Sequence, residues 1–245
     1  MSGALNELGI ASPWLNVPGF LGGLPPARMD LELEMGAFLP MSISMQPRSP
    51  VENRCLVRYP GGVLLHTGMP NPGLRESIKQ YAARWARLDL PVWLSLLPNN
   101  ADEAEEMSEV VDELENVTTF QLELPRRSSK EECRSILTAA AGEKSFFVEI
   151  PLDLVNRDTL GMVQNSPAFG VVLSAPRGRL LNDGKWVNGR LYGPALYPQV
   201  ISQLHSLRRL GKAVVIGCGV SSIEQGEQLI GLGVDGVQVD LPLWN

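Results

Sequence analysis

The feature that most constrains this chain is a regular alternation of short apolar runs with longer segments of helical periodicity. Several of the apolar runs contain almost no polar residue, which is typical of parallel strands covered on both faces. The runs predict strands at Trp14–Val17, Phe38–Ser42, Pro91–Leu96, Thr118–Leu124, Phe146–Ile150, Gly170–Leu173, Ala213–Ile216 and Gly236–Val239. Strands that alternate with helices predict an α/β fold with a parallel sheet.

The segments between the strands predict the helices of that fold. Apolar residues at helical spacing, such as Leu74, Ile78, Tyr81 and Trp85, indicate one buried helix face. The predicted helices are Arg28–Met35, Gly73–Leu88, Ala101–Leu114, Ser129–Ala141, Leu154–Val163, Ala195–Leu210 and Ser222–Leu232. Eight strands and seven helices fit a single (β/α)8 barrel, or TIM barrel, that spans residues 1–245 as one domain. The segment LVRYPGGVLLH predicts an added β-hairpin that turns at Pro60-Gly61-Gly62.

The printed sequence ends at Leu243-Trp244-Asn245, directly after the eighth predicted strand. We therefore expect a shortened C-terminus that lacks the eighth helix and leaves an apolar groove beside the Ser222–Leu232 helix. An apolar patch of that kind usually marks an interface. The expected occupant is another protein chain, a second copy in a homo-oligomer, or the N-terminal segment Met1–Ile10.

Composition excludes several classes of function. A net charge of -6 and a pI of about 5.1 argue against a nucleic-acid partner. The three cysteines and two histidines show no CxxC, HxH or HExxH spacing, so neither a disulfide framework nor a metal site is expected. No apolar run approaches the ~18 residues of a membrane span, and no signal peptide precedes the first strand. A cytoplasmic protein is expected.

Five motifs in order along the chain carry a family resemblance: SPWLNVPGFLGG, RYPGGVLLHTGMPNPG, GRLYGPAL, KAVVIGCGVSS and VDGVQV. They resemble the NPVxNASGxxG, NxxGLPNPG, GGLSGPAL, GxGGISS and VQVGTA motifs of the dihydroorotate dehydrogenase family. The resemblance covers nearly the whole chain, and the order of the motifs is more specific than any one of them. It implies a barrel that evolved to bind FMN at the carboxyl ends of its strands.

The residues that the family uses for chemistry are replaced. Met41 and Glu149 stand where the resemblance implies lysines beside the flavin, and Leu65 stands at the first asparagine of NxxGLPN, which leaves Asn71 as the candidate substrate-binding residue. Where the family reads NxSCPN, this chain reads ELPRRS from Glu123, so that Arg126 occupies the place of the catalytic base. An arginine stays protonated at neutral pH and cannot act as a base. No catalytic residue is therefore predicted.

The phosphate-binding turns of the family are partly kept. Gly193, Cys218, Gly219, Ser221 and Ser222 form the candidate cofactor-binding residues, because backbone N–H groups at Gly-rich turns and helix starts can hold a phosphate. The Gly-Thr that follows the eighth strand in the family is Asp240-Leu241 here, and a carboxylate would repel a phosphate. A working anion site and inherited turn chemistry both stay open as interpretations.

Other candidates have a simpler structural interpretation beside the functional one. Arginines of two loops could form a new anion pocket or could be solvated: Arg126, Arg127, Arg177, Arg179 and Arg190. Cys218 could be a reactive thiol, but a buried packing residue is favoured. His66 could act in catalysis, although no carboxylate is placed to orient it.

Taken together, the residues favour a degenerate dihydroorotate dehydrogenase-like protein that has lost dihydroorotate oxidation. The expected role is that of a pseudoenzyme, a binding or structural subunit of a larger assembly. Two alternatives remain: an FMN-binding oxidoreductase that acts on another small molecule, and a binder of a phosphorylated metabolite without redox chemistry. FMN is a possible cofactor on the resemblance, and the replaced residues count against it.

Overall fold

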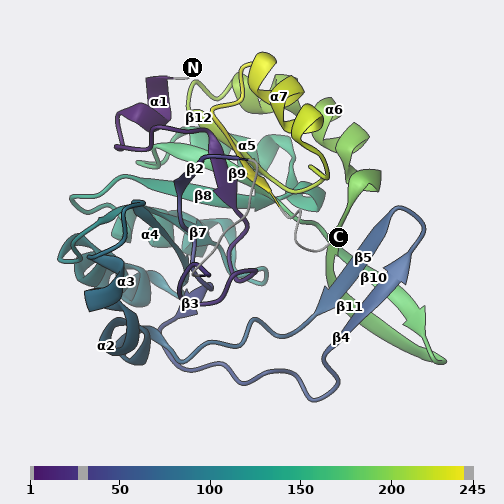
Figure 1. Ribbon diagram of the computed structural model, residues 1–245, viewed down its shortest axis with the longest axis horizontal. Coiled ribbons are helices and arrows are strands. Elements are labelled where there is room, and N and C mark those ends of the chain that lie inside the picture. The colour runs from purple at the N-terminus through teal and green to yellow at the C-terminus, as the bar shows by residue number, and fades with distance from the viewer. Residues whose placement is uncertain (1–2, 27–32, 240–245) are drawn as a thin grey trace.

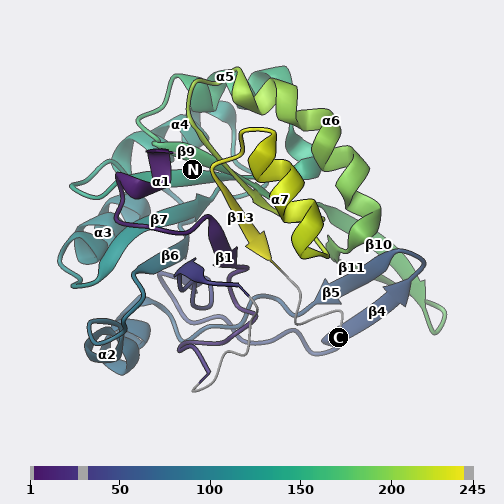
Figure 2. The same cartoon turned by 45° about the horizontal axis from the view of Figure 1, so that its top comes forward.

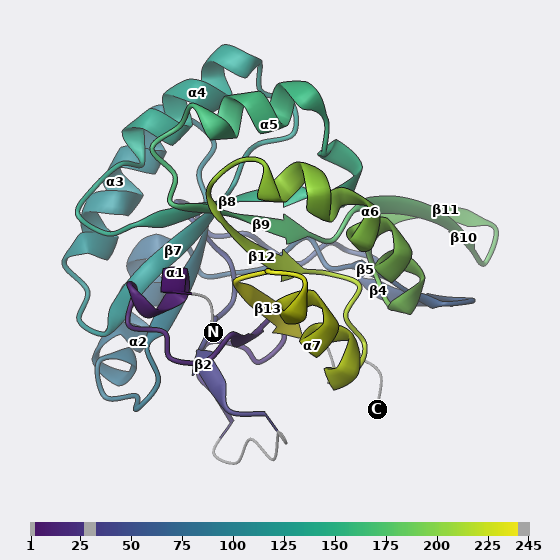
Figure 3. The same ribbon diagram turned by 90° about the horizontal axis from the view of Figure 1, so that it is seen from above.

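The structure is a computed structural model that describes residues 3–26 and 33–239. Parallel strands form a curled sheet around a central core, and helices surround it (Figures 1 and 3). The strands follow one another in the order β1 (Trp14–Asn16), β2 (Met35–Ala37), β6 (Val92–Leu97), β7 (Val117–Glu123), β8 (Phe146–Pro151), β9 (Gly170–Ser174), β12 (Ala213–Gly217) and β13 (Gly236–Val239), and β13 pairs with β1. The predicted TIM-barrel architecture is confirmed.

The second position of the ring is split between two short strands that flank the strand predicted at Phe38–Ser42, so that prediction is wrong except for a bridge at Phe38. A parallel bridge from Phe38 to Val92 joins the end of β2 to β6, and β3 (Ile43–Ser44) pairs farther along β6. Where regular pairing lapses, the carboxamide of Asn16 accepts from the backbone N–H of Leu39 at 2.8 Å and donates to its carbonyl at 2.6 Å. One buried side chain thus replaces the missing strand-to-strand bonds and helps to close the ring.

Two apolar layers hold the barrel together. The inner layer fills the ring with buried side chains that come from different strands: Leu15, Leu39, Trp93, Phe147, Val172 and Val215. The outer layer lies between the ring and its helices and contains most of the other buried apolar residues. Strands that are covered on both faces explain why their sequences are almost continuously apolar.

Six helices of the outer shell connect the strands. They are α2 (Leu74–Trp85), α3 (Ala101–Asp112), α4 (Lys130–Ala139), α5 (Arg157–Gln164), α6 (Tyr197–Arg208) and α7 (Ile223–Gly231), with 3-10 turns η1 (Leu152–Leu154) and η2 (Pro194–Leu196). Four of them begin after a side chain that accepts a hydrogen bond from the first turn: Asn100, Ser129, Asn156 and Ser222. These polar residues satisfy backbone donors that the helix cannot pair itself. No helix in the described ranges is long and apolar enough to cross a membrane.

A short helix at the N-terminus, α1 (Gly3–Asn6), closes the amino end of the ring. Figure 2 shows α1 beside the ring of strands. Leu5 and Ile10, both fully buried, pack against the inner layer. A Cβ at Gly36 would lie 2.8 Å from the Ile10 Cγ2, which shows how closely this segment approaches β2. Residues 3–10 therefore pack against the inner core, which differs from the expectation that Met1–Ile10 lies in an outer groove.

A separate four-stranded antiparallel sheet projects from the barrel beside its mouth (Figures 1 and 3). It consists of the hairpins β4 (Cys55–Tyr59) with β5 (Gly62–His66) and β10 (Arg177–Asn182) with β11 (Lys185–Tyr192), joined between β5 and β11. The first hairpin was predicted. The second was not, although Asp183-Gly184 at its tip, with φ of 47° and 72°, is a typical two-residue hairpin turn.

One predicted helix is wrong at its C-terminal end. The predicted segment Arg28–Met35 ends inside β2, and Leu33 and Glu34 are not helical. Its residues 28–32 lie outside the described part of the chain, as do Asp240, Leu241, Leu243 and Trp244. The groove predicted beside the eighth strand therefore stays a prediction.

Candidate functional site

A cavity of about 680 Å³ opens at the carboxyl ends of the barrel strands, beneath the projecting sheet. Its walls come from the loop after β1, the loop after β5, and strand β11, and include Val17, Phe20, Leu65, Asn188 and Tyr192. This end of a TIM barrel is where its enzymes place their active sites. This cavity, which we call the mouth cavity, is therefore the candidate functional site.

A cluster of buried charges lies at the base of this cavity. Arg190, from β11, pairs through its Nη2 with Glu123 at the end of β7, and through its Nη1 with Glu149 of β8 at 2.9 Å. The three side chains are only 16%, 9% and 5% exposed. Arg177, at the start of β10, lies 3.8 Å from Glu123 and is half-exposed.

The pKa shifts follow from this burial. Burial raises the pKa of the Glu123 carboxyl, and the Arg190 guanidinium opposes that rise only in part. Burial lowers the pKa of the Arg190 guanidinium, but the two carboxylates outweigh it and hold the pKa above its ordinary value. Arg190 is thus fixed as a cation between two carboxylates.

Two glutamines extend the cluster across the ring. Gln121 of β7 donates from its Nε2 to the Glu149 Oε2 at 2.9 Å. Gln238 of β13 donates from its Nε2 to the Gln121 Oε1 at 2.8 Å. All four side chains, from Gln238 to Arg190, line the cavity and link opposite sides of its floor.

The predicted phosphate residues come together, but they lie beside the cavity. The turn at Gly219 packs on the start of α6, where a Cβ would lie 3.1 Å from the Tyr197 backbone nitrogen. Ser221 donates its N–H to the Gln225 Oε1 at 2.9 Å, and Ser222 caps α7. Cys218 is buried in the outer core.

The hairpin turn also reaches this region. Gly61 accepts at its carbonyl the N–H of Ala195, two residues after Gly193, at 3.1 Å. A Cβ at Gly61 would lie 2.8 Å from the Ala195 Cβ. Backbone donors near both predicted phosphate turns are thus engaged within the chain. Phosphate binding by Gly193, Cys218, Gly219, Ser221 and Ser222 remains a prediction.

Asn71 holds a loop in place. Its Oδ1 accepts from the N–H groups of Ser44 and Gly73 at 3.2 and 3.0 Å, and its Nδ2 donates to the Met69 carbonyl at 3.1 Å. The side chain is buried and does not line the cavity. The substrate contact predicted for Asn71 remains a prediction.

The other residues singled out in the sequence divide between the cavity and its surroundings. Met41, Leu65 and His66 line the cavity. Arg126 turns to Asp153 in a 2.6 Å ion pair, and Arg179 stacks on the exposed Trp186 ring at 4.8 Å. The five loop arginines therefore do not converge on one anion pocket.

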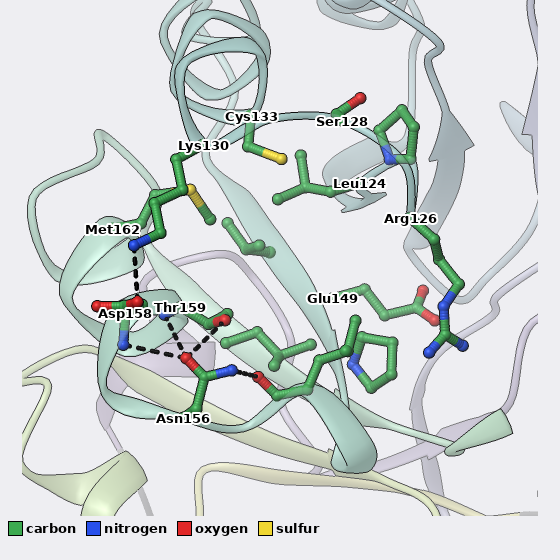
Figure 4. Close-up of a pocket in the computed structure, with 15 residues that line it drawn as sticks. Leu124, Arg126, Ser128, Lys130, Cys133, Glu149, Asn156, Asp158, Thr159 and Met162 are labelled. Atoms are coloured by element: carbon green, nitrogen blue, oxygen red, sulfur yellow. Dashed lines mark hydrogen bonds and ion pairs between the residues drawn. The ribbon is translucent and has the colours of Figure 1, made fainter.

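A smaller pocket of about 250 Å³ lies between α4 and α5 (Figure 4). Lys130 and Asp158 form an ion pair of 2.6 Å on one side, and Arg126 and Glu149 border the other. Burial raises the pKa of the Cys133 thiol in its wall, and Glu132 adds to the rise. That thiol is not activated as a nucleophile. Among the described residues, no group of histidines, cysteines and carboxylates could hold a metal ion.

Sequence reasoning found Glu149 but missed its partners. The signal for Arg190 was present, because the second glycine of GGLSGPAL is an arginine in GRLYGPAL. A charged residue in place of a glycine next to a Gly-rich turn needs a counter-charge, and two carboxylates stand at the ends of β7 and β8.

Comparisons with known proteins agree with the fold. No family model matches the chain. The chain is 24% identical over 265 residues to the dihydroorotate dehydrogenase B (NAD(+)) catalytic subunit of Trichlorobacter lovleyi, covering 98% of this chain and 86% of the relative. It is 24% identical over 260 residues to a putative dihydroorotate dehydrogenase A (fumarate) of Pediococcus pentosaceus, covering 94% and 84%.

A solved structure shows the same architecture. The crystal structure of DHODH from Eimeria tenella in complex with ferulenol superposes with a TM-score of 0.74 at 14% identity, covering 96% of this chain and 77% of that one.

Proposed function

The chain belongs to the dihydroorotate dehydrogenase family, and from that premise we propose that it no longer oxidises dihydroorotate and acts as a binding or structural subunit of a larger assembly. The observation that carries the proposal is the Glu123–Arg190–Glu149 cluster at the base of the mouth cavity. Each of its members replaces a residue that the family motifs keep, and the three replacements contact one another.

The replacements together change the part of the cavity where the family motifs imply a flavin. Arg190 adds a long side chain where the GGLSGPAL motif has a glycine, and Glu149 puts a carboxylate where the motif has a lysine. A lysine stabilises the negative charge that a reduced flavin develops, whereas a carboxylate destabilises it. The described residues therefore do not fit FMN, and we derive no redox step through it.

The place of the catalytic base supports the same proposal. Arg126 stands there, and its guanidinium is held by Asp153 at the rim. Burial lowers the pKa of the Arg190 guanidinium, but Glu123 and Glu149 outweigh this effect and keep it protonated as well. Neither side chain can remove a proton from a substrate carbon.

The subunit role rests on the relatives. Several of them are named as the catalytic subunit of dihydroorotate dehydrogenase B, and a subunit by that name acts within an assembly. We propose that this chain keeps an assembly role in the cytoplasm, with a protein partner or a second copy. A retained cavity of about 680 Å³ favours a role that includes small-molecule binding.

We test the loss of activity by turnover with added FMN and an electron acceptor, with a catalytic relative as positive control. We expect no saturable dihydroorotate-dependent reduction, because each lost catalytic group costs about 10²–10⁴-fold. Protein purified without added flavin should show no absorbance near ~450 nm. Robust saturable turnover would refute the proposal.

A paired variant tests the physical reason. Glu149→Lys combined with Arg190→Gly restores the family's residue types, and we expect it to bind FMN more tightly than the wild type in a fluorescence titration. Arg179→Gly, in the same hairpin but outside the cavity, is the matched control and should change nothing. Equal FMN affinity of all three proteins would show that the cluster does not control flavin binding.

A further inference from the structure

The hydrogen bonds on the floor of the mouth cavity all run one way, because each glutamine donates toward Glu149. Glu149 pairs with the Arg190 guanidinium, and a carboxylate so paired only accepts hydrogen bonds. Gln121 must therefore turn its Nε2 toward the Glu149 Oε2, at 2.9 Å, and its Oε1 the other way. The Oε1 in turn requires a donor from the next side chain. This fixes which end of each carboxamide faces which neighbour.

The far end of this row of hydrogen bonds is the Gln238 Oε1, which is an acceptor. Gln238 uses its Nε2 on the Gln121 Oε1 at 2.8 Å, so its own Oε1 is turned away from the network. That oxygen lies beside Gly217, where a Cβ would come within 2.7 Å of it. No hydrogen bond to the Gln238 Oε1 is made by any residue in the described ranges. Gly217 and Gln238 both line the cavity, and a side chain at Gly217 would cover this oxygen.

A second polar group adjoins it on the next strand. Ser174, at the end of β9, stands directly opposite Gly217 of β12 in the register of the sheet. Its side chain is 5% exposed and lines the cavity, and its hydroxyl has no hydrogen-bond partner among the described residues. A buried polar atom without a partner is costly, and a ligand is one way to satisfy it.

We propose that this floor, formed by Gln238, Ser174 and the Glu149 carboxylate, binds the hydrogen-bond donors of a small planar molecule, such as an amidinium, guanidinium or amino group. The proposal rests on the proposed function, since a flavin in the cavity would cover the same floor. The Nε2 of each glutamine donates inside the network, and the Gln238 Oε1 is the acceptor that the network leaves without a donor. The apolar walls at Val17, Phe20 and Leu65 suit a planar body.

The rim of the mouth cavity carries positive charge, whereas its floor carries the Glu149 carboxylate. Arg48 and Arg177 line the cavity, and both lie near enough to Glu123 to influence its charge. They favour an anionic group at the outer end of a ligand, whereas the floor favours a donor at the inner end. The two ends of the cavity therefore need separate probes.

Benzamidine and benzoate are the matched probes, because they share shape and differ in donor and acceptor character. We measure their affinities for the full chain by calorimetry. We expect benzamidine to bind, and its affinity to fall about tenfold in Gln238→Met and severalfold in Ser174→Ala. Gln199→Met, on the exposed face of α6, is the matched control and should leave the affinity unchanged.

The variants and outcomes separate the alternatives. Benzoate binding that is lost only in Arg48→Gln places the anion at the rim and supports the assignment of the floor. The proposal is overturned if benzamidine does not bind the wild type, if neither floor variant weakens it, or if benzoate binding is the one lost in Gln238→Met. Ser174→Ala removes a single oxygen, so it keeps the test available if Gln238→Met is unstable. Dihydroorotate turnover would overturn the proposed function instead, and that assay is independent of these titrations.

Discussion

At the scale of single residues, the molecule is defined by two carboxylates that share one buried guanidinium. Removing charges from water costs several kcal/mol per ion, and close pairing offsets this cost only when every charge has a partner. Here Glu123 and Glu149 hold the two ends of one guanidinium, Arg190, and Gln121 donates one hydrogen bond to the other oxygen of Glu149. Removal of Arg190 alone should therefore lower the stability of the protein more than replacement of all three charged residues together.

We predict that Arg190→Met lowers the free energy of unfolding by about 3–5 kcal/mol, because it leaves the buried Glu149 without a cation and Glu123 with only the half-exposed Arg177 at 3.8 Å. The triple variant Arg190→Met, Glu123→Gln and Glu149→Gln should be more stable than the single one, since no charge is left behind. Urea unfolding of both proteins measures the difference. A single variant as stable as the triple one would show that the carboxylates are solvated once Arg190 is gone.

Asn116 is a second residue on whose side chain the stability of the fold depends. Its backbone has a φ of 60°, and its Nδ2 donates to the carbonyls of Trp85, Leu88 and Leu90 at 2.9–3.1 Å. Asn116→Asp replaces the donor with an acceptor and should destabilise the fold by about 1–3 kcal/mol in thermal or urea unfolding. Asn116→Gly keeps the left-handed backbone accessible, so it should cost less than Asn116→Ala. Equal stability of all three variants would contradict this role.

The sequence identified single residues at this scale, but not their partners. Met41, Leu65, Arg126 and Glu149 were found as departures from family motifs. The pairing of Glu149 with Arg190 spans 41 positions, and it depends on where a hairpin folds over the barrel. No local pattern carries that information. The direction of the hydrogen bonds between Gln238, Gln121 and Glu149 likewise becomes visible only once the strands are placed in the ring.

At the scale of elements, strands and helices could be predicted where burial against the core sets the pattern of apolar residues. Seven of the eight apolar runs became strands of the ring, because both faces of each strand are covered, whereas Phe38–Ser42 lies between β2 and β3 and pairs only at Phe38. The helix expected at Arg28–Met35 failed at its end, because Met35 pairs with Trp14 as part of β2. The β10–β11 hairpin was missed, because its alternating pattern is exposed and only the Asp183-Gly184 turn marks it. Tertiary pairing outweighed local propensity in both cases.

The docking of α7 gives a prediction at this scale. Gly226 lies against Trp14, and a Cβ there would come within 2.2 Å of the indole ring. Gly226→Ala should therefore destabilise the fold by about 1–3 kcal/mol, although alanine favours a helix by about 1 kcal/mol. Gly161→Ala, inside α5 with open space around it, is the control and should be neutral or stabilising. Unfolding midpoints that move in the same direction for both variants would rule out the close contact.

At the scale of the whole molecule, the ring and its inner layer act as one unit. The second strand position reaches β6 through the Phe38–Val92 bridge, and it reaches β1 through the bonds of Asn16 to Leu39. The barrel itself was predictable from the order of strands and helices. The closure at the amino end was not, because the helix α1 has only 4 residues and is too short to show periodicity. Leu5 and Ile10 meet the core only after the ring has formed.

The amino-terminal closure gives the last prediction. Leu5 is 2% exposed and lies in the inner cluster, where the Cβ of a residue at Gly236 would come within 2.9 Å of its Cδ1. Leu5→Ala should lower the free energy of unfolding by about 2–5 kcal/mol, since it opens a cavity in a layer shared by most strands. Leu232→Ala removes the same atoms at a 46% exposed position and should cost far less. Because the inner layer is continuous, we expect circular dichroism and tryptophan fluorescence to lose signal together in Leu5→Ala. If the two transitions separate, or if Leu5→Ala is no more costly than Leu232→Ala, the N-terminal segment is not part of the cooperative core.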